Sequence, residues 1–202
     1  ELYFALLFPG ITVMFVFFIV GMAGASLLNE RDTGTLRRLV AAPISKASVI
    51  TGKALAYALL ACAQVVVLFS VGRIAFGMPL GRSPLGLVVV TVLLGLVASA
   101  FGLMIAALAR SAKQADNVGT MLGFLMAGLG GAIAIGPIPA TRVEGIRSLL
   151  ARLTPQGNAV ESYYSLMAEK AALGDISTEV LTLAGFLVLF VAIAAWRFRY
   201  EQ

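Results

Sequence analysis

Histidine is absent from this sequence, cysteine occurs once, and only 12% of the 202 residues are charged. Without histidine the chain offers no imidazole metal ligand and no histidine proton relay. It also lacks the GxxxxGK(S/T) phosphate-binding loop. Around Gly52-Lys53, Ala47 stands where that loop needs its first glycine, and Ala54 stands where it needs a serine or threonine. No clustered nucleophile, base and acid is present either. The chain is therefore not expected to be an enzyme, to hydrolyse ATP, or to bind a cofactor or metal itself.

Carboxylates are missing from the middle of the apolar runs. All ten lie in connectors, tails or run ends: Glu1, Glu30, Asp32, Asp116, Glu144, Glu161, Glu169, Asp175, Glu179 and Glu201. Proton- and sodium-coupled carriers usually need an ionisable group at membrane depth, so this pattern disfavours an ion-coupled secondary transporter.

The sequence is rich in long apolar runs. Hydrophobic residues make up 60% of the chain and the mean hydropathy is +0.97, which places it in a membrane. A bilayer core needs about 20 apolar helical residues. Five runs qualify or nearly so: Leu2–Leu28, Val49–Phe76, Leu85–Ala109, Val118–Ile135 and Thr178–Trp196. We expect an all-α transmembrane helix bundle in which residues 1–202 form a single domain.

The basic residues behind the net charge of +5 are unevenly distributed along the chain. Basic residues gather in the first and third connectors and after the last run: Arg31, Arg37, Arg38, Lys46 and Lys53, then Arg110 and Lys113, then Arg197 and Arg199. The positive-inside rule places these regions in the cytoplasm, so the fragment begins outside and ends inside, and no nucleic-acid partner is needed. Five spans with an outward start predict that one earlier helix is missing.

The long connector before the last run predicts an outer hairpin over about 141–174. Apolar residues recur there at helical spacing until Thr154-Pro155, as in an interfacial or re-entrant amphipathic helix. Asn158 with Glu161 then resembles a capping box, and Gly174 a helix stop. A hairpin lying on the outer leaflet and a substrate gate both remain open.

The first connector predicts a short cytoplasmic helix over about 33–42. Residues 30–35 supply acids and hydroxyls suited to a helix N-terminus, and Pro43 stops the helix. Apolar residues fall on one helical face and arginines on the others: Leu36, Leu39 and Val40, against Arg37 and Arg38. Two interpretations stay open, a membrane-surface helix and a lever that docks on a cytoplasmic partner.

Gln64 lies in the middle of the second run, where it suits either a translocation path or a hydrogen bond between helices. Small residues such as Gly21, Gly24 and Gly102 predict close helix packing, and Pro9-Gly10 predicts a kink or a start near the outer end of the first span.

Residues 30–45, Glu-Arg-Asp-Thr-Gly-Thr-Leu-Arg-Arg-Leu-Val-Ala-Ala-Pro-Ile-Ser, resemble the E-R-x-x-G-T-L-x-R-L-x-x-x-P-I-S signature of ABC type-2 exporter permeases. Pro9-Gly10, Gln64 and the outer pair Tyr163-Tyr164 fit the same pattern, so the resemblance covers essentially the whole chain. It differs after Thr154-Pro155, where many relatives carry tryptophan and this chain has Gln156.

The resemblance implies a six-helix permease, here N-terminally truncated, whose first connector is a coupling helix. The implied partners are an ATP-binding-cassette ATPase subunit that binds ATP and Mg, a second permease copy in a homo- or heterodimer, and membrane lipid. The implied contact residues are Glu30, Arg31, Gly34, Thr35, Leu36, Arg37, Arg38, Leu39 and Pro43. Glu30 and the arginines would form charge pairs with the ATPase.

The implied function is ATP-driven export of a hydrophobic or amphipathic compound, such as a drug, an antibiotic or a lipid-like molecule. The plasma membrane of a bacterium fits best. An ion-coupled carrier and a non-transporting membrane scaffold are the alternatives.

Overall fold

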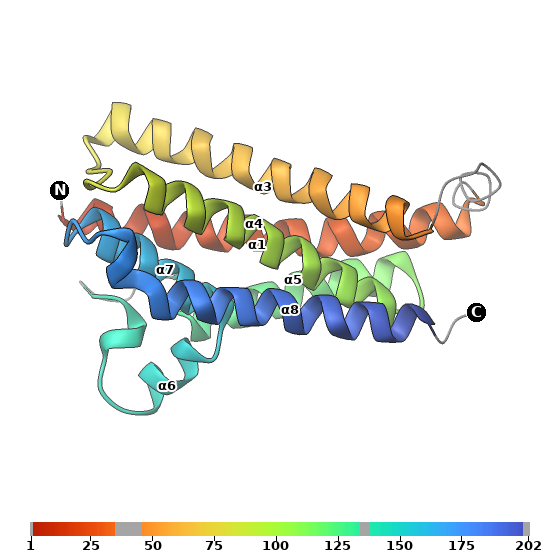
Figure 1. Cartoon of the computed structure of the whole chain (residues 1–202). Coiled ribbons are helices and arrows are strands. Elements are labelled where there is room, and N and C mark those ends of the chain that lie inside the picture. The colour runs from red at the N-terminus through yellow and green to blue at the C-terminus, as the bar shows by residue number, and fades with distance from the viewer. Residues whose placement is uncertain (1, 35–45, 134–137, 200–202) are drawn as a thin grey trace.

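The computed structural model describes residues 2–34, 46–133 and 138–199. These ranges hold seven α-helices and two short 3-10 helices, and they contain no strand (Figure 1). The α-helices are α1 (Leu2–Asp32), α3 (Lys46–Phe76), α4 (Pro84–Leu108), α5 (Ala112–Leu129), α6 (Ile146–Arg152), α7 (Pro155–Met167) and α8 (Ser177–Arg199). The 3-10 helices are η1 (Ala140–Arg142) and η2 (Leu173–Ile176). The all-α prediction is confirmed across these residues.

Four helices are long and apolar enough to cross a membrane. They cover Leu7–Asp32, Ser48–Phe76, Pro84–Leu108 and Leu173–Arg197. The chain is therefore a multi-pass membrane protein, and four of the five predicted runs match these helices.

The helix that carries the predicted run Val118–Ile135 has other bounds, and residues 134–135 of the run lie outside the described ranges. This helix, α5, begins at Ala112 because the Ser111 side chain accepts a hydrogen bond from the backbone N–H of Gln114 at 3.2 Å. The helix thus includes Lys113 and Asp116, and it is not among the four apolar spans.

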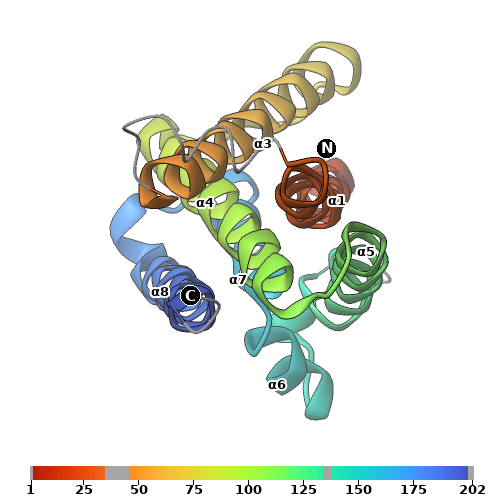
Figure 2. The ribbon, with the colours of Figure 1, turned by 90° about the vertical axis from the view of Figure 1, so that its right-hand side faces the viewer.

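The centre of the bundle is α4. It packs against α1, α3 and α8, and more locally against α5 and α7 (Figure 2). Val90, Leu94 and Val97 of α4 are fully buried. The outer helices α3 and α8 expose much of their apolar surface, including Ile74, as expected of helices that face lipid.

Glycines set the closest helix contacts. A Cβ added at Gly102 of α4 would lie 2.8 Å from the Val20 carbonyl oxygen of α1, and one at Gly119 of α5 would lie 2.7 Å from the Gly21 Cα. The prediction of close packing at Gly21, Gly24 and Gly102 is confirmed.

The first helix is longer than the sequence suggested. It runs through Pro9 and ends at Asp32, where the N–H of Thr33 donates to the Asn29 carbonyl at 2.9 Å. Gly34 follows with φ of 73°, the left-handed conformation that commonly closes a helix. Residues 30–32 therefore close α1, and the prediction that they open the next helix was wrong. Residues 35–42 of the predicted coupling helix lie outside the described ranges.

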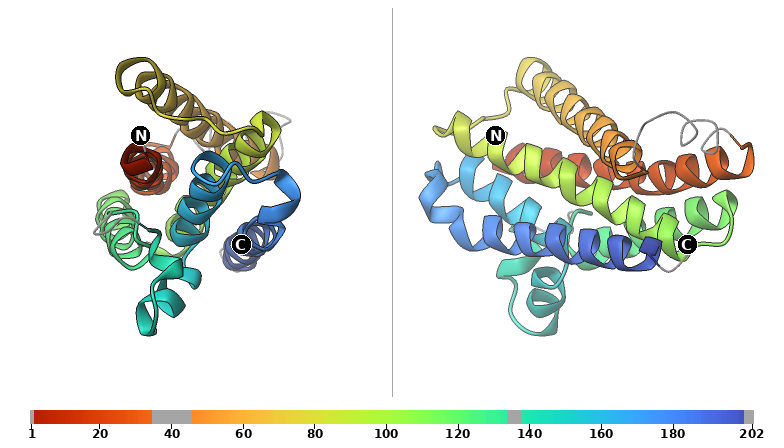
Figure 3. Two further views of the ribbon diagram at one scale, coloured as in Figure 1. Left: turned by 90° about the vertical axis from the view of Figure 1, so that its left-hand side faces the viewer. Right: turned by 45° about the vertical axis from the view of Figure 1, so that its right-hand side comes forward.

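The connections fall at two opposite ends of the bundle. One end carries the C-terminal end of α1, the α4–α5 turn and the C-terminal end of α8, and the other carries the α3–α4 and α7–α8 connections (Figures 1 and 3). Among the described residues, the first end includes Arg31, Arg110, Lys113 and Arg197. We call it the basic end, and the other the hairpin end.

Candidate functional site

At the basic end, an ion pair joins α1 to α3. Glu30 Oε1 lies 2.6 Å from Lys53 Nζ, and Lys53 Nζ also donates to Ser26 Oγ at 2.8 Å. The Lys53 side chain is only 16% exposed and the Glu30 side chain 30%. Loss of one partner would leave a half-buried charge without compensation, so the pair holds the two helices together.

Arg31 links α1 to a third part of the bundle. Its Nη2 donates to the Arg110 carbonyl at 3.3 Å, in the turn between α4 and α5. That turn is itself closed by the N–H of Arg110, which donates to the Gln114 side-chain oxygen at 2.8 Å. Arg31 also lies 3.5 Å from Asp32 in an exposed ion pair. A displacement of the first connector would therefore reach α1, α3 and the α4–α5 turn together.

These contacts concern three of the predicted partner residues. Glu30 points to Lys53, Arg31 reaches Arg110, and Gly34 forms the turn after α1. The remaining predicted residues lie outside the described ranges: Thr35, Leu36, Arg37, Arg38, Leu39 and Pro43.

Gln64 is half-buried on α3 and forms no hydrogen bond with the part of the chain that the structure describes. Its place on a translocation path stays a prediction.

At the hairpin end, η1, α6 and α7 occupy the segment for which an outer hairpin was predicted, and its position outside the membrane stays a prediction. Thr154 caps α7 by accepting a hydrogen bond from the N–H of Gly157 at 3.0 Å, and Pro155 occupies the first helical turn. The predicted capping box at Asn158 was wrong: its Nδ2 donates to the carbonyls of Arg152 at 2.8 Å and Thr154 at 2.7 Å, which closes the α6–α7 turn.

The predicted stop at Gly174 was also wrong. The helix α7 ends at Met167, and Gly174 lies in η2 instead. Between them Lys170 has a φ of 58°, so the chain turns through the left-handed region before it reaches η2.

Every residue of α7 is buried, polar ones included. The Gln156 Nε2 donates to the Gly123 carbonyl of α5 at 3.0 Å, and the Tyr163 and Thr91 hydroxyls are 2.9 Å apart across α7 and α4. The helix is thus inserted between α1, α4, α5 and α8. The short α6, in contrast, projects from the side of the bundle (Figure 2).

A network of charges centres on Arg142 of η1. Its Nε donates to Glu161 Oε1 at 2.6 Å, and its Nη2 donates to Glu169 Oε2 and Ser165 Oγ, both at 2.9 Å. The Thr141 hydroxyl donates to the other Glu161 oxygen. The hydrogen bonds and charge of Arg142 hold the pKa of Glu169 below its usual value, while the carboxylates raise the pKa of Arg142.

Sequence reasoning missed this network. It counted Glu161 as a connector residue, whereas the structure buries Glu161 inside the bundle with 8% of its surface exposed. The one available signal was the Thr154-Pro155 pair, which starts a helix as readily as it ends one.

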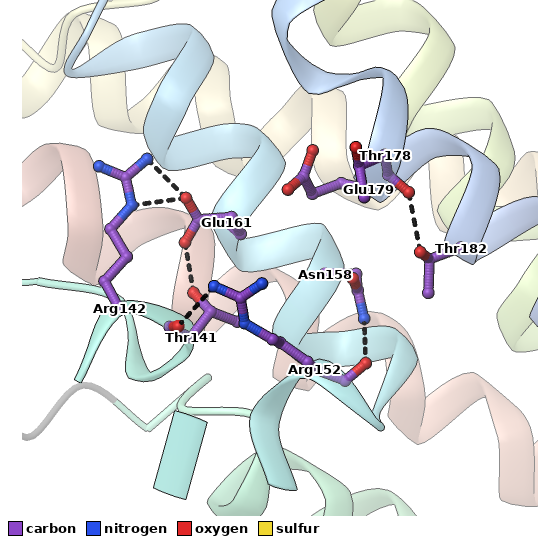
Figure 4. Close-up of a pocket in the computed structure, with 8 residues that line it drawn as sticks. All are labelled: Thr141, Arg142, Arg152, Asn158, Glu161, Thr178, Glu179 and Thr182. Atoms are coloured by element: carbon purple, nitrogen blue, oxygen red, sulfur yellow. Dashed lines mark hydrogen bonds and ion pairs between the residues drawn. The ribbon is translucent and has the colours of Figure 1, made fainter. Parts of the chain in front are cut away.

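Beside the network lies a polar pocket of about 190 Å³ (Figure 4). Its walls come from four elements: Thr141 and Arg142 of η1; Arg152 of α6; Asn158 and Glu161 of α7; and Thr178, Glu179 and Thr182 of α8. Charged and hydroxyl groups thus meet near the start of a membrane-crossing helix.

Two comparisons with known proteins bear on these sites. The profile of the family described as "ABC-2 family transporter protein" matches residues 1–196. The chain is also 26% identical over 187 residues to the linearmycin resistance permease protein LnrN of Bacillus subtilis (strain 168). That match covers 91% of the chain and 46% of the relative, so the chain spans about half the relative's length.

Proposed function

This chain belongs to the ABC-2 family of transporter proteins, and from that premise we propose that it exports a hydrophobic or amphipathic compound across the plasma membrane. The energy comes from ATP hydrolysis in a partner ATPase subunit, which binds ATP and Mg. A second permease copy completes the translocation path. The relative named as a linearmycin resistance permease supports export of a drug, an antibiotic or a lipid-like molecule.

The observation that carries this proposal is the pair of polar links at the basic end. Glu30 binds Lys53 of α3, and Arg31 binds the Arg110 carbonyl before α5. When the ATPase subunits close, they push on the first connector, and these links pass the displacement to several helices at once. A rigid-body tilt of these helices changes the side to which the path is open.

The contact with the ATPase uses residues 30–43 of the first connector. Leu36 and Leu39 provide an apolar anchor, and Arg37 and Arg38 provide charges for acidic groups on the ATPase. The Glu30 carboxylate acts mainly inside the permease, because Lys53 neutralises it.

The proposed topology places the basic end in the cytoplasm and the hairpin end outside. In this topology α5 is a fifth span despite Lys113 and Asp116, because it packs against α1 and places both charges near the basic end. The buried α7 enters the bundle from the outer leaflet as a re-entrant helix, and α6 lies at the outer surface.

The decisive experiment is purification of the full-length protein from its native membrane with any bound ATPase. The variant Arg37→Glu/Arg38→Glu reverses the proposed contact charges, and Arg82→Glu/Arg147→Glu makes the same charge change outside the connector. We expect the ATPase to co-purify with the wild type and the control and to be lost from the connector variant. Absence of an ATPase from all three samples would refute the proposed partnership.

One observation favours a second candidate. Glu161 is a buried carboxylate, the kind of group that an ion-coupled carrier requires. Its pairing with Arg142 leaves it compensated in the present conformation, so the exporter remains the better-supported function. Transport that survives ATP depletion and stops when the ion gradient is collapsed would favour the carrier. Reconstituted vesicles without flux of any kind would favour a scaffold.

A further inference from the structure

The pocket at the hairpin end contains two charged side chains that the Arg142 network does not use. Arg152 donates only to the Thr141 carbonyl, at 3.3 Å, and forms no ion pair with any described residue. Glu179 forms no ion pair or hydrogen bond within the described ranges. A guanidinium has five N–H donors, so most of the donors of Arg152 remain available.

These two groups face the pocket from opposite walls. Figure 4 shows the Arg152 side chain extending from α6 toward Thr141, and the Glu179 carboxylate pointing from α8 toward α7. Arg142 and Glu161 compensate each other on the inner wall, at 2.5 Å. With Arg152 and Glu179 added, the pocket carries two positive and two negative side chains, so its own net charge is zero. A ligand whose charges also sum to zero keeps the occupied pocket electrically neutral.

Exposed apolar residues lie on the two helices, α6 and α8, that contribute Arg152 and Glu179 to the pocket. Ile146 of α6 is 75% exposed and Leu181 of α8 is 72% exposed, and Leu149 and Leu153 also present apolar surface on α6. Thr178 and Glu179 lie in the first turn of α8, near one end of the Leu173–Arg197 span. Polar groups at the end of a span beside exposed leucines match the boundary between lipid head groups and acyl chains.

We propose that this pocket binds the head group of an amphiphile that carries both an anionic group and a primary ammonium. The anion binds the Arg152 guanidinium, the ammonium binds Glu179, and the apolar part lies along the exposed residues of α6 and α8. The volume of about 190 Å³ suits a head group alone, because sites for whole drug-sized ligands occupy roughly 300–1,000 Å³. A bilayer phospholipid and an exported amphiphile share this chemistry.

The test is native mass spectrometry of the full-length protein with phosphatidylethanolamine, which has both charges, or phosphatidylglycerol, which has only the anion. Arg152→Gln should lower retention of both lipids by at least about tenfold, since a charge-assisted hydrogen bond contributes roughly 1.5–3 kcal/mol and every 1.4 kcal/mol is a factor of ten. Glu179→Gln should lower retention of phosphatidylethanolamine about fivefold and leave phosphatidylglycerol unchanged. Arg147→Gln and Glu144→Gln, which lie outside the pocket on the same hairpin, should change neither lipid.

The proposal is overturned if Glu179→Gln affects both lipids equally, or if the control variants lose as much lipid as the pocket variants. Arg152→Lys keeps the positive charge and should retain most of the binding, which separates loss of the site from loss of the fold. Addition of the ATPase and ATP distinguishes the two sources: an exported amphiphile leaves the pocket, and a resident lipid stays. Lipid binding is measured without the ATPase, so its failure leaves the proposed export function untouched.

Discussion

The two ends of the molecule are held together in different ways. At the basic end, the described polar contacts of α1 with its neighbours are the half-buried ion pair Glu30–Lys53, the hydrogen bond from Lys53 to Ser26, and the hydrogen bond from Arg31 to the Arg110 carbonyl. At the hairpin end, the buried α7 is fixed by Arg142, by its cap and by hydrogen bonds to α4 and α5. The comparison indicates that the hairpin end is the rigid one. The basic end has fewer polar contacts, and its displacement would also shift the close packing of α1 against α4 and α5.

The largest effect is expected from breaking the rigid end. Arg142→Met leaves the Glu161 carboxylate buried without its partner, and loss of one member of a buried pair costs about 3–5 kcal/mol. Thermal unfolding of the purified protein measures this loss. The double variant Arg142→Met/Glu161→Leu should recover most of it, because neither charge then remains buried. A double variant as unstable as the single one would contradict the ion-pair account.

A smaller effect on stability, and a larger one on coupling, is expected at the other end. Lys53→Met leaves Glu30 without a partner and should lower stability by about 1–3 kcal/mol. In vesicles with the ATPase it should also reduce transport per ATP hydrolysed, because α3 no longer follows α1. The charge swap Glu30→Lys/Lys53→Glu should restore coupling. Restored stability without restored coupling would assign Glu30 to the ATPase contact instead.

The contrast between the ends also explains how much the sequence could predict. The α4 span was predicted within one residue at each end, because its apolar run has the right length. Ser83 and Pro84, which the prediction did not use, mark the start of the helix in the structure. The bounds of α5 differ from the predicted run because polar residues at its start were read as connector, although Ser111 caps the helix before them.

The Arg142–Glu161 pair could not be predicted. The two residues are 19 positions apart, and they meet only because α7 folds back into the bundle. That insertion depends on contacts with several spans at once, which no local pattern records. Glu30 and Arg31 were predicted as partner-contact residues from the connector motif, but their partners inside the chain, Lys53 and Arg110, are set by the packing of α1 against α3 and α5.

Arg31→Gln tests the weaker of the two links at the basic end. The hydrogen bond to the Arg110 carbonyl is long and exposed, so stability should fall by less than about 1 kcal/mol. If the link passes motion to the α4–α5 turn, transport per ATP should still fall, by at most about fivefold. Arg197→Gln removes the same charge from the same end and should have no such effect. Equal losses of transport in both variants would indicate that the lower positive charge of the basic end, and not the hydrogen bond from Arg31, causes the effect.

The smallest effect concerns pH at the hairpin end. Arg142 lowers the pKa of Glu169 below its ordinary value of 4.5, so the folded protein binds fewer protons at this site than the unfolded chain. The stabilising contribution is therefore complete above about pH 4.5 and is lost as pH falls through the lowered pKa. Glu169 is 44% exposed, so solvent screens the pair and the change should be modest. Thermal unfolding followed from pH 7 to pH 3 should show a shallower loss for Glu169→Gln than for the wild type. Glu144→Gln, an exposed carboxylate on the same hairpin, should follow the wild-type curve.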